Sequence, residues 1–170
     1  MRKPLRVLVC GGRDFNRHVV VYDALTELQD ERGPIEVVIA GRHPGEDPNG
    51  ADYWAESWSF MQRVPFYGFP ARWGDINHPD ALVRRRSDGT LYDAKAGPRR
   101  NQRMIEEGRP TICVALPGGR GTADMVRRAR AAGIEVREIS GRAALADQEK
   151  GETAPAPSTS TTARGRDHAG

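Results

Sequence analysis

The feature that most constrains this fold is a repeated alternation between short apolar runs and segments with helical periodicity. Three of the runs are apolar almost throughout, which is typical of strands buried on both faces of a sheet. Two weaker runs follow the same rhythm further along the chain. The predicted strands cover residues 5–10, 35–40, 64–69, 111–116 and 134–139.

Between these runs, apolar residues recur at the three-to-four-residue spacing of a helix. Strands that alternate with helices in this way form a parallel sheet with right-handed crossovers. The sequence therefore predicts an α/β fold, Rossmann-like and doubly wound, with a mostly parallel sheet of about five strands and helices on both faces. The predicted helices lie around residues 21–28, 54–61, 98–107 and 125–132.

The chain is expected to contain one domain over residues 1–142, followed by a tail at 143–170. No Leu, Ile, Val, Met or aromatic residue occurs from Gln148 onward, and residues 153–162 are only Ala, Pro, Ser and Thr. Such a composition cannot offset the entropy of ordering, so we expect the tail to be disordered.

Residues 74–93 are predicted to be an insertion in this domain. Asp88–Gly89 is a turn signal between short β-prone runs, which favours a small hairpin. Three interpretations remain open: a solvated loop, a lid over a ligand, and a basic edge for single-stranded nucleic acid. The last would use Arg84, Arg85, Arg86 and Tyr92.

Composition excludes several classes of protein. The net charge is +3 in 170 residues, well below that of a dedicated DNA binder. The two cysteines lie inside apolar runs, so neither a disulfide framework nor a metal site is expected. Neither a membrane-spanning stretch nor a signal peptide is apparent, and we expect a cytoplasmic protein without membrane association.

Glycine-rich loops follow three of the predicted strands, at the sheet edge where such folds bind ligands. Glycine lets the backbone approach a ligand closely, and a helix start presents free N–H groups to an anion. The loop at 117–122 is thus a candidate phosphate cradle. It lacks the lysine of a Walker A loop, and the first loop is not GxGxxG, so an NTPase or ordinary dehydrogenase is disfavoured. The alternative is that these turns are glycine-rich only for tight packing.

Each candidate side chain has a chemical role and a structural alternative. Three arginines, Arg13, Arg100 and Arg120, are predicted to lie at the ligand-binding edge of the sheet. They can clamp a phosphate or carboxylate, or simply be solvated. Asp14 and Asp52 can accept from ribose hydroxyls or an amine, although Asp52 can equally cap a helix. Asn101 is a base or ribose contact, or a local cap. The candidate ligand-binding residues are Gly11, Gly12, Arg13, Asp14, Gly41, Asp52, Arg100, Asn101, Gly118, Gly119, Arg120, Gly121 and Thr122.

Tryptophans fall into two groups. Trp54 and Trp58 share one helix face and are expected in the core. Trp73 follows the third predicted strand and either stacks on a base or covers the sheet edge.

Several blocks of this sequence resemble a known family. They are CGGRDF at 10–15, GAD at 50–52 with Ala55, Trp73, KAGPRRN at 95–101 with Met104, and PGGRGTADMVRRARAAGI at 117–134. Together they resemble the YspA-like, cpYpsA-related branch of the SLOG superfamily. The resemblance implies a Rossmann-like fold and a pocket for nucleotide-derived ligands between the first and fourth loops. It also leaves open a homodimer.

The same superfamily includes LOG-type phosphoribohydrolases, DNA-processing DprA proteins and sensors of bacterial and phage conflict systems. LOG-type enzymes carry a catalytic Glu where this chain has Met125. Asp124 is one residue, or about 100°, away around a helix and cannot simply substitute. We therefore expect binding or sensing of a phosphorylated, nucleotide-derived small molecule, without another cofactor. The alternatives are N-glycosidic hydrolysis of a nucleoside monophosphate, using Asp14 or Asp52, and single-stranded nucleic-acid binding. Whether the protein is an enzyme stays open.

Overall fold

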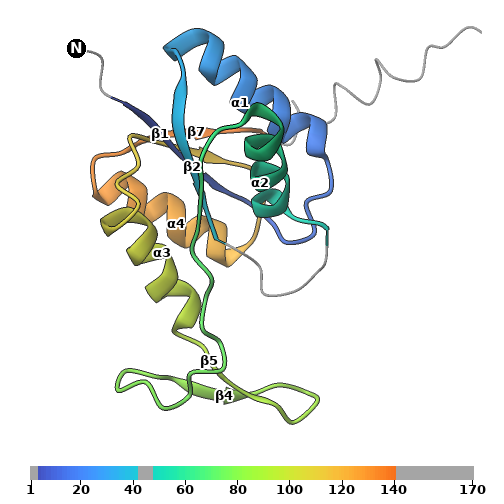
Figure 1. The fold of residues 1–170 in the computed structure, drawn as a ribbon. Coiled ribbons are helices and arrows are strands. Elements are labelled where there is room, and N and C mark those ends of the chain that lie inside the picture. Colours follow the sequence, from blue (N-terminus) through green and yellow to red (C-terminus); the bar gives the residue numbers. More distant parts are fainter. Residues whose placement is uncertain (1–3, 42–47, 141–170) are drawn as a thin grey trace, which may run out of the picture.

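The computed structural model describes residues 4–41 and 48–140, and the tail predicted at 143–170 lies outside the described residues. Five parallel strands form the main sheet, in the order β3-β2-β1-β6-β7 (Figure 1). The α/β, Rossmann-like prediction is confirmed. The elements are β1 (Leu5–Cys10), α1 (His18–Arg32), β2 (Ile35–Ala40), α2 (Ala51–Gln62), β3 (Phe66–Gly68), β4 (Val83–Arg85), β5 (Leu91–Asp93), α3 (Ala96–Glu106), β6 (Ile112–Ala115), α4 (Arg120–Ala131) and β7 (Glu135–Glu138).

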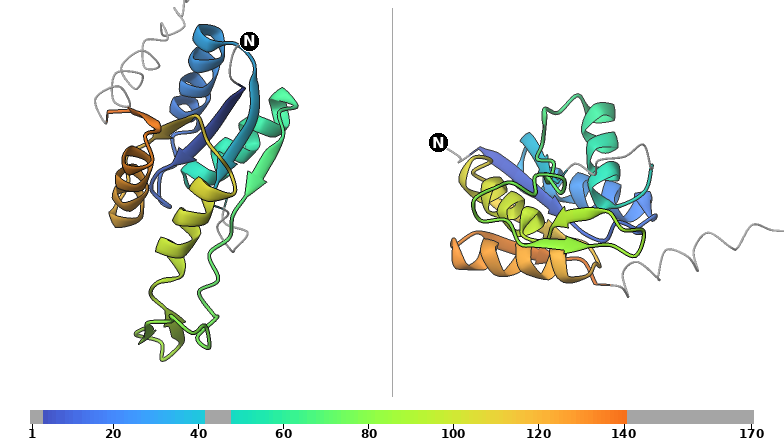
Figure 2. Two further views of the ribbon diagram at one scale, coloured as in Figure 1. Left: turned by 90° about the vertical axis from the view of Figure 1, so that its left-hand side faces the viewer. Right: turned by 90° about the horizontal axis from the view of Figure 1, so that it is seen from below.

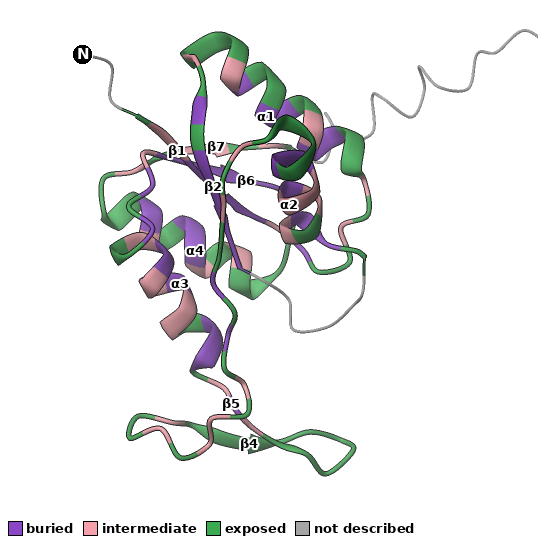
Figure 3. Ribbon diagram, in the orientation of Figure 1, coloured by how far each residue is buried: buried purple, intermediate pink, exposed green. Residues whose placement is uncertain are grey.

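Helices cover both faces of the sheet, with α1 and α2 on one side and α3 and α4 on the other (Figure 2). Side chains of β1 alternate between the two layers: Val7 and Val9 pack with α1 and α2, while Leu8 packs with α3 and α4. This alternation is why the central strands are apolar almost throughout and mostly buried (Figure 3). Trp58 is fully buried in the first layer, and Trp54 packs against the same cluster while partly buried.

The strand order reverses at β1, which pairs with β2 on one side and β6 on the other. The chain leaves β1 toward α1 on one face of the sheet and leaves β6 toward α4 on the opposite face. The loops after these two adjacent strands therefore diverge and open a crevice at the carboxyl edge. This is the position that the sequence predicted for the ligand site.

The insertion contains the expected hairpin, with β4 and β5 antiparallel around the Asp88–Gly89 turn. It projects beyond the amino end of α3, away from the main sheet (Figure 1). Its base is fastened by Asp93, whose buried carboxylate accepts hydrogen bonds from the amides of Leu82 and Lys95 and pairs with Arg99. Within the described residues, no helix is long and apolar enough to cross a membrane.

Candidate functional site

A cavity of about 640 Å³ opens at the carboxyl edge of the sheet. It is bordered by the loops after β1, β2 and β6 and by the first turns of α2, α3 and α4. These segments are far apart in the sequence, and the parallel sheet brings them together. The candidate residues that line the cavity are Gly11, Gly12, Arg13, Asp14, Gly41, Asp52, Arg100, Asn101, Gly119, Arg120, Gly121 and Thr122.

Gly118 is the candidate residue that does not line this cavity. It packs between the first and fourth loops, where a Cβ would lie only 2.7 Å from the amide nitrogen of Gly12. At Gly11, a Cβ would meet those of Ala51 and Leu116 at 2.5 and 2.8 Å. Close packing thus explains the glycine at both positions, which was the structural alternative for these turns.

Helices α2, α3 and α4 all begin at the cavity, and none has a side-chain cap. Gly50 occupies the cap position of α2 with a φ of 99°, so Asp52 lies inside the first turn and does not cap the helix. The amide of Ala51 already donates to the carbonyl of Gly12. At α4, by contrast, the first-turn residues Arg120, Gly121 and Thr122 line the cavity, and a helix start in this position is suited to an anion.

Asp52 and Arg100 converge above Gly41 at one end of the cavity. A Cβ on Gly41 would coincide with the Nη1 atom of Arg100 and lie 3.0 Å from the Oδ2 atom of Asp52. Burial raises the pKa of Asp52 to about 7, although the positive charges of Arg100 and Arg13 act in the opposite direction. Within the described part of the chain, the Asp52 carboxyl group has no hydrogen-bond partner. With a pKa near 7, it can act as an acid or a base at neutral pH.

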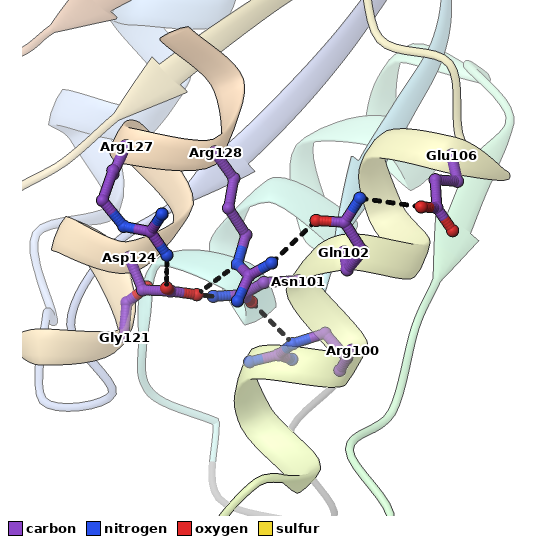
Figure 4. Close-up of polar contacts among 8 residues, drawn as sticks. All are labelled: Arg100, Asn101, Gln102, Glu106, Gly121, Asp124, Arg127 and Arg128. Carbon is purple, nitrogen blue, oxygen red and sulfur yellow. Dashed lines mark hydrogen bonds and ion pairs between the residues drawn. The ribbon is translucent and has the colours of Figure 1, made fainter. Parts of the chain in front are cut away.

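Asn101 is buried in α3 and joins that helix to α4 (Figure 4). Its Nδ2 atom donates to the carbonyl of Gly121 at 3.2 Å and to Oδ2 of Asp124 at 3.0 Å. Its Oδ1 atom accepts from Nε of Arg100 at 3.0 Å. Asn101 thus lies within the helix and does not cap its start.

Asp124 is the centre of this network. It also accepts from Arg127 at 2.7 Å and from Arg128 at 2.8 Å. Burial alone would raise the pKa of Asp124, but the hydrogen bonds from Arg128, Asn101 and Arg127 outweigh it and hold the pKa below its ordinary value. The Asp124 carboxylate is therefore ionised, and its hydrogen bonds hold α3 against α4.

Trp73 forms part of the cavity wall near Arg13. The Arg13 guanidinium lies over the indole, 5.3 Å from the ring centroid, and the same indole packs against Gly97. Arg120 and Asp14 are exposed on the rim. The hairpin strands β4 and β5 do not line the cavity, but Trp73 and Ala94 beside their base do.

The sequence interpretation missed several lining residues. Asn49, Ala94 and Gly97 carry no separate sequence signal, while Asp124 and Met125 lie inside the 117–134 block, where the sequence indicates only a departure from an enzyme motif. Met125 is almost fully buried in the core and also lines the cavity.

Cys10 borders the cavity from β1 and contacts Cys113, with 3.9 Å between the sulfur atoms. The hydrogen bond with Cys113 and burial strongly raise the pKa of the Cys10 thiol, so it stays protonated. Across residues 4–41 and 48–140, no group of three or more His, Cys, Asp and Glu side chains is placed to hold a metal ion.

Comparison with known proteins gave one family and a distant structural match. Residues 5–75 match the model of the YspA, cpYpsA-related SLOG family. The comparison with curated proteins found no match. Among solved structures, the phosphoribosylglycinamide formyltransferase of Coxiella burnetii, determined in complex with CHES, is 16% identical with a TM-score of 0.36. The match covers 78% of this chain and 62% of that one, so this chain spans less than two thirds of that protein.

The matched segment contains the first glycine-rich loop, Gly41, Asp52 and Trp73. The fourth loop lies outside it, and its place in the site follows from the geometry alone. The family and the Rossmann-like fold support a general role in binding or hydrolysing a nucleotide-related ligand. Over residues 5–75, this chain is therefore similar to the YspA, cpYpsA-related SLOG family.

Proposed function

We propose that this protein binds a phosphorylated, nucleotide-derived small molecule at the carboxyl edge of its sheet. The observation that carries the proposal is that one cavity combines uncapped helix starts with three arginines, Arg13, Arg100 and Arg120. Its volume of about 640 Å³ lies in the usual range for small-molecule sites. An anion gains from both the helix dipoles and the guanidinium groups.

In this proposal the phosphate lies on the backbone amides at the start of α4, between Gly119 and Thr122. Arg120 follows Gly119 directly and neutralises the phosphate from the rim. The ribose and base extend toward Arg100 and Asp52 at the other end. A carboxyl group beside a guanidinium offers an acceptor next to donors, which suits ribose hydroxyls or the polar edge of a base.

The test is a panel of nucleoside monophosphates, diphosphates and nucleotide sugars, followed by thermal unfolding and calorimetric titration. A true ligand raises the melting temperature by mass action. Arg120→Ala is expected to weaken binding by about tenfold, the loss of one charge-assisted hydrogen bond. Arg130→Ala, in an exposed ion pair with Glu138 on α4 and β7, removes the same charge and is expected to leave affinity unchanged. No shift with any ligand, or equal effects of the two variants, would refute the proposal.

N-glycosidic hydrolysis of a nucleoside monophosphate is the second candidate, and Asp52 favours it. Met125 supplies no carboxylate, and Asp124 is committed to Asn101, Arg127 and Arg128. Asp52 borders the cavity with a pKa near 7, a value suited to general acid–base catalysis.

Chromatography of nucleotide mixtures incubated with protein decides between the two functions. Hydrolysis predicts release of free base that Asp52→Asn abolishes while binding survives. Asp14→Asn tests the exposed carboxylate on the rim in the same assay. If stoichiometric wild-type protein binds the ligand but releases no free base, hydrolysis is excluded and binding remains as the function.

A further inference from the structure

The side chain of Asn101 has no free hydrogen-bond donor to offer a ligand, although it lies in the cavity wall. It is 4% exposed, its amide nitrogen donates to Gly121 and Asp124, and its oxygen accepts from Arg100. Both hydrogens of the amide group are therefore used inside the protein. A buried amide with every donor satisfied has a defined orientation, since turning it over would place its oxygen against two acceptors.

We propose that Asn101 is a positioning residue, which sets the Arg100 guanidinium relative to the start of α4 and does not touch the ligand. The proposal rests on the proposed function in one respect: Arg100 and the α4 start are the two ends of the ligand site. Asn101 is bonded to both, through Nε of Arg100 and the carbonyl of Gly121 (Figure 4). One amide group thus fixes the spacing between the two ends.

The other contacts of Arg100 show what this bond achieves. Nη1 of Arg100 donates to the carbonyl of Phe69 at 3.4 Å, and the guanidinium lies directly over Gly41. With Nε held by Asn101 and Nη1 by Phe69, the plane of the guanidinium is defined. Its remaining N–H groups are available to the cavity beside Asp52.

On the opposite side, the partners of Asn101 are themselves held. Asp124 is fixed by Arg127 and Arg128, and Nη1 of Arg128 donates to Oε1 of Gln102 at 2.7 Å. Gln102 therefore makes a second hydrogen bond between α3 and α4, and this bond does not involve Arg100. It provides a matched control, because Gln102→Ala also loosens the helix pair but leaves the Asn101–Arg100 bond intact.

The first measurement needs no ligand. In spectra of protein labelled with ¹⁵N-arginine, the Arg100 Nε–H signal is located by its loss in Arg100→Lys. We expect this hydrogen to exchange with water at least about tenfold more slowly than that of Arg127, whose Nε makes no hydrogen bond to residues 4–41 or 48–140. Asn101→Ala should abolish the protection, and Gln102→Ala should preserve it. Equal exchange at Arg100 and Arg127 in the wild-type protein overturns the proposal, even if Asn101→Ala does not fold.

The second measurement separates positioning from general loosening. A bound nucleoside monophosphate spans both ends of the site, whereas inorganic phosphate needs only the start of α4. Asn101→Ala is expected to raise the dissociation constant for the nucleotide about tenfold while changing that for phosphate less than about twofold. Gln102→Ala is expected to leave both constants unchanged. Equal loss of both ligands in Asn101→Ala, or no loss of either, overturns the proposal. If the wild-type protein binds neither these compounds nor any other member of the nucleotide panel, the proposed function fails, and the exchange measurement still decides the role of Asn101.

Discussion

The amide of Gly12 donates to the carbonyl of Pro117 at 2.9 Å, and this bond joins the first and fourth strand-to-helix loops. The two loops belong to β1 and β6, which are neighbours in the sheet. Because the backbones touch, the amides of the fourth loop and the side chains of the first loop border one cavity. The site thus depends on how closely these two loops approach each other.

Gly118→Ala is expected to destabilise the protein. Its Cβ would lie 2.7 Å from the amide nitrogen of Gly12 and 2.9 Å from the carbonyl carbon of Gly11, and neither backbone atom can move independently. Forcing such an overlap costs about 1–3 kcal/mol of unfolding free energy. Urea unfolding of the purified variant measures this loss.

Gly121→Ala is the control for that variant. Nothing lies within 4 Å of a Cβ at Gly121, and the residue is in the first turn of α4. We expect its stability to be unchanged or higher, by up to about 1 kcal/mol, because alanine favours a helix. Equal stabilities of the two variants would show that the loops can separate without cost.

Asp52→Asn is expected to stabilise the protein at high pH and not at low pH. The pKa of Asp52 is raised to about 7 in the folded protein, above its ordinary value, chiefly by burial. Between the unfolded and folded pKa values, the folded state holds the proton that the unfolded state has lost. The contribution of Asp52 to stability therefore falls as the pH rises through this window, and is lowest above pH 7.

Replacing the carboxyl group by an amide removes this dependence. We expect Asp52→Asn to exceed the wild type by about 1–3 kcal/mol at pH 8 and to match it near pH 4. Denaturant unfolding of both proteins across this range measures the difference, and other titrating groups cancel because they are common to both. A difference that does not change with pH would contradict a raised pKa at Asp52.

Much of the fold was predictable because its signals are local. The runs at 35–40 and 111–116 are apolar on both faces, which only a covered parallel strand requires, and the structure places strands there. The turn at Asp88–Gly89 likewise carries its own conformational preference. The general position of the site followed from topology, since the carboxyl ends of parallel strands share one edge.

The roles of individual site residues were less predictable because they depend on partners distant in sequence. The local sequence around Asn101 predicts a ligand contact or a helix cap. Only its contacts with Gly121 and Asp124 show that its amide hydrogens are already bonded within the protein. Gly118 belongs to the same loop as Gly119, yet one packs against the first loop and the other borders the cavity. No pattern within either segment distinguishes these outcomes.

Arg13 and Trp73 are expected to be energetically coupled. The guanidinium lies 5.3 Å from the indole centroid, and cation–π pairs at exposed sites contribute about 0.5–1 kcal/mol. A double-mutant cycle of Arg13→Ala and Trp73→Ala, measured by urea unfolding, should give a coupling energy of that size. The same cycle with Arg120 in place of Arg13 should give none, and similar values for both would mean that the stack contributes nothing specific.

Asp93→Ala is expected to loosen the hairpin base without unfolding the sheet. The Asp93 carboxylate is buried and accepts from the amides of Leu82 and Lys95, so its loss frees both segments that enter and leave the hairpin. Hydrogen exchange at these two amides should accelerate by about tenfold or more, while the amides of β1 and β6 stay protected.

Asp80→Ala supplies the matched control, because it removes a carboxylate from an exposed ion pair with Lys95 in the same insertion. We expect little change in exchange for this variant, since exposed pairs contribute little. If Asp93→Ala instead accelerated exchange throughout the sheet, the insertion would be part of the cooperative core. Confinement of the change to residues 74–95 would establish the hairpin as a separately opening element, hinged beside Trp73 at the cavity wall.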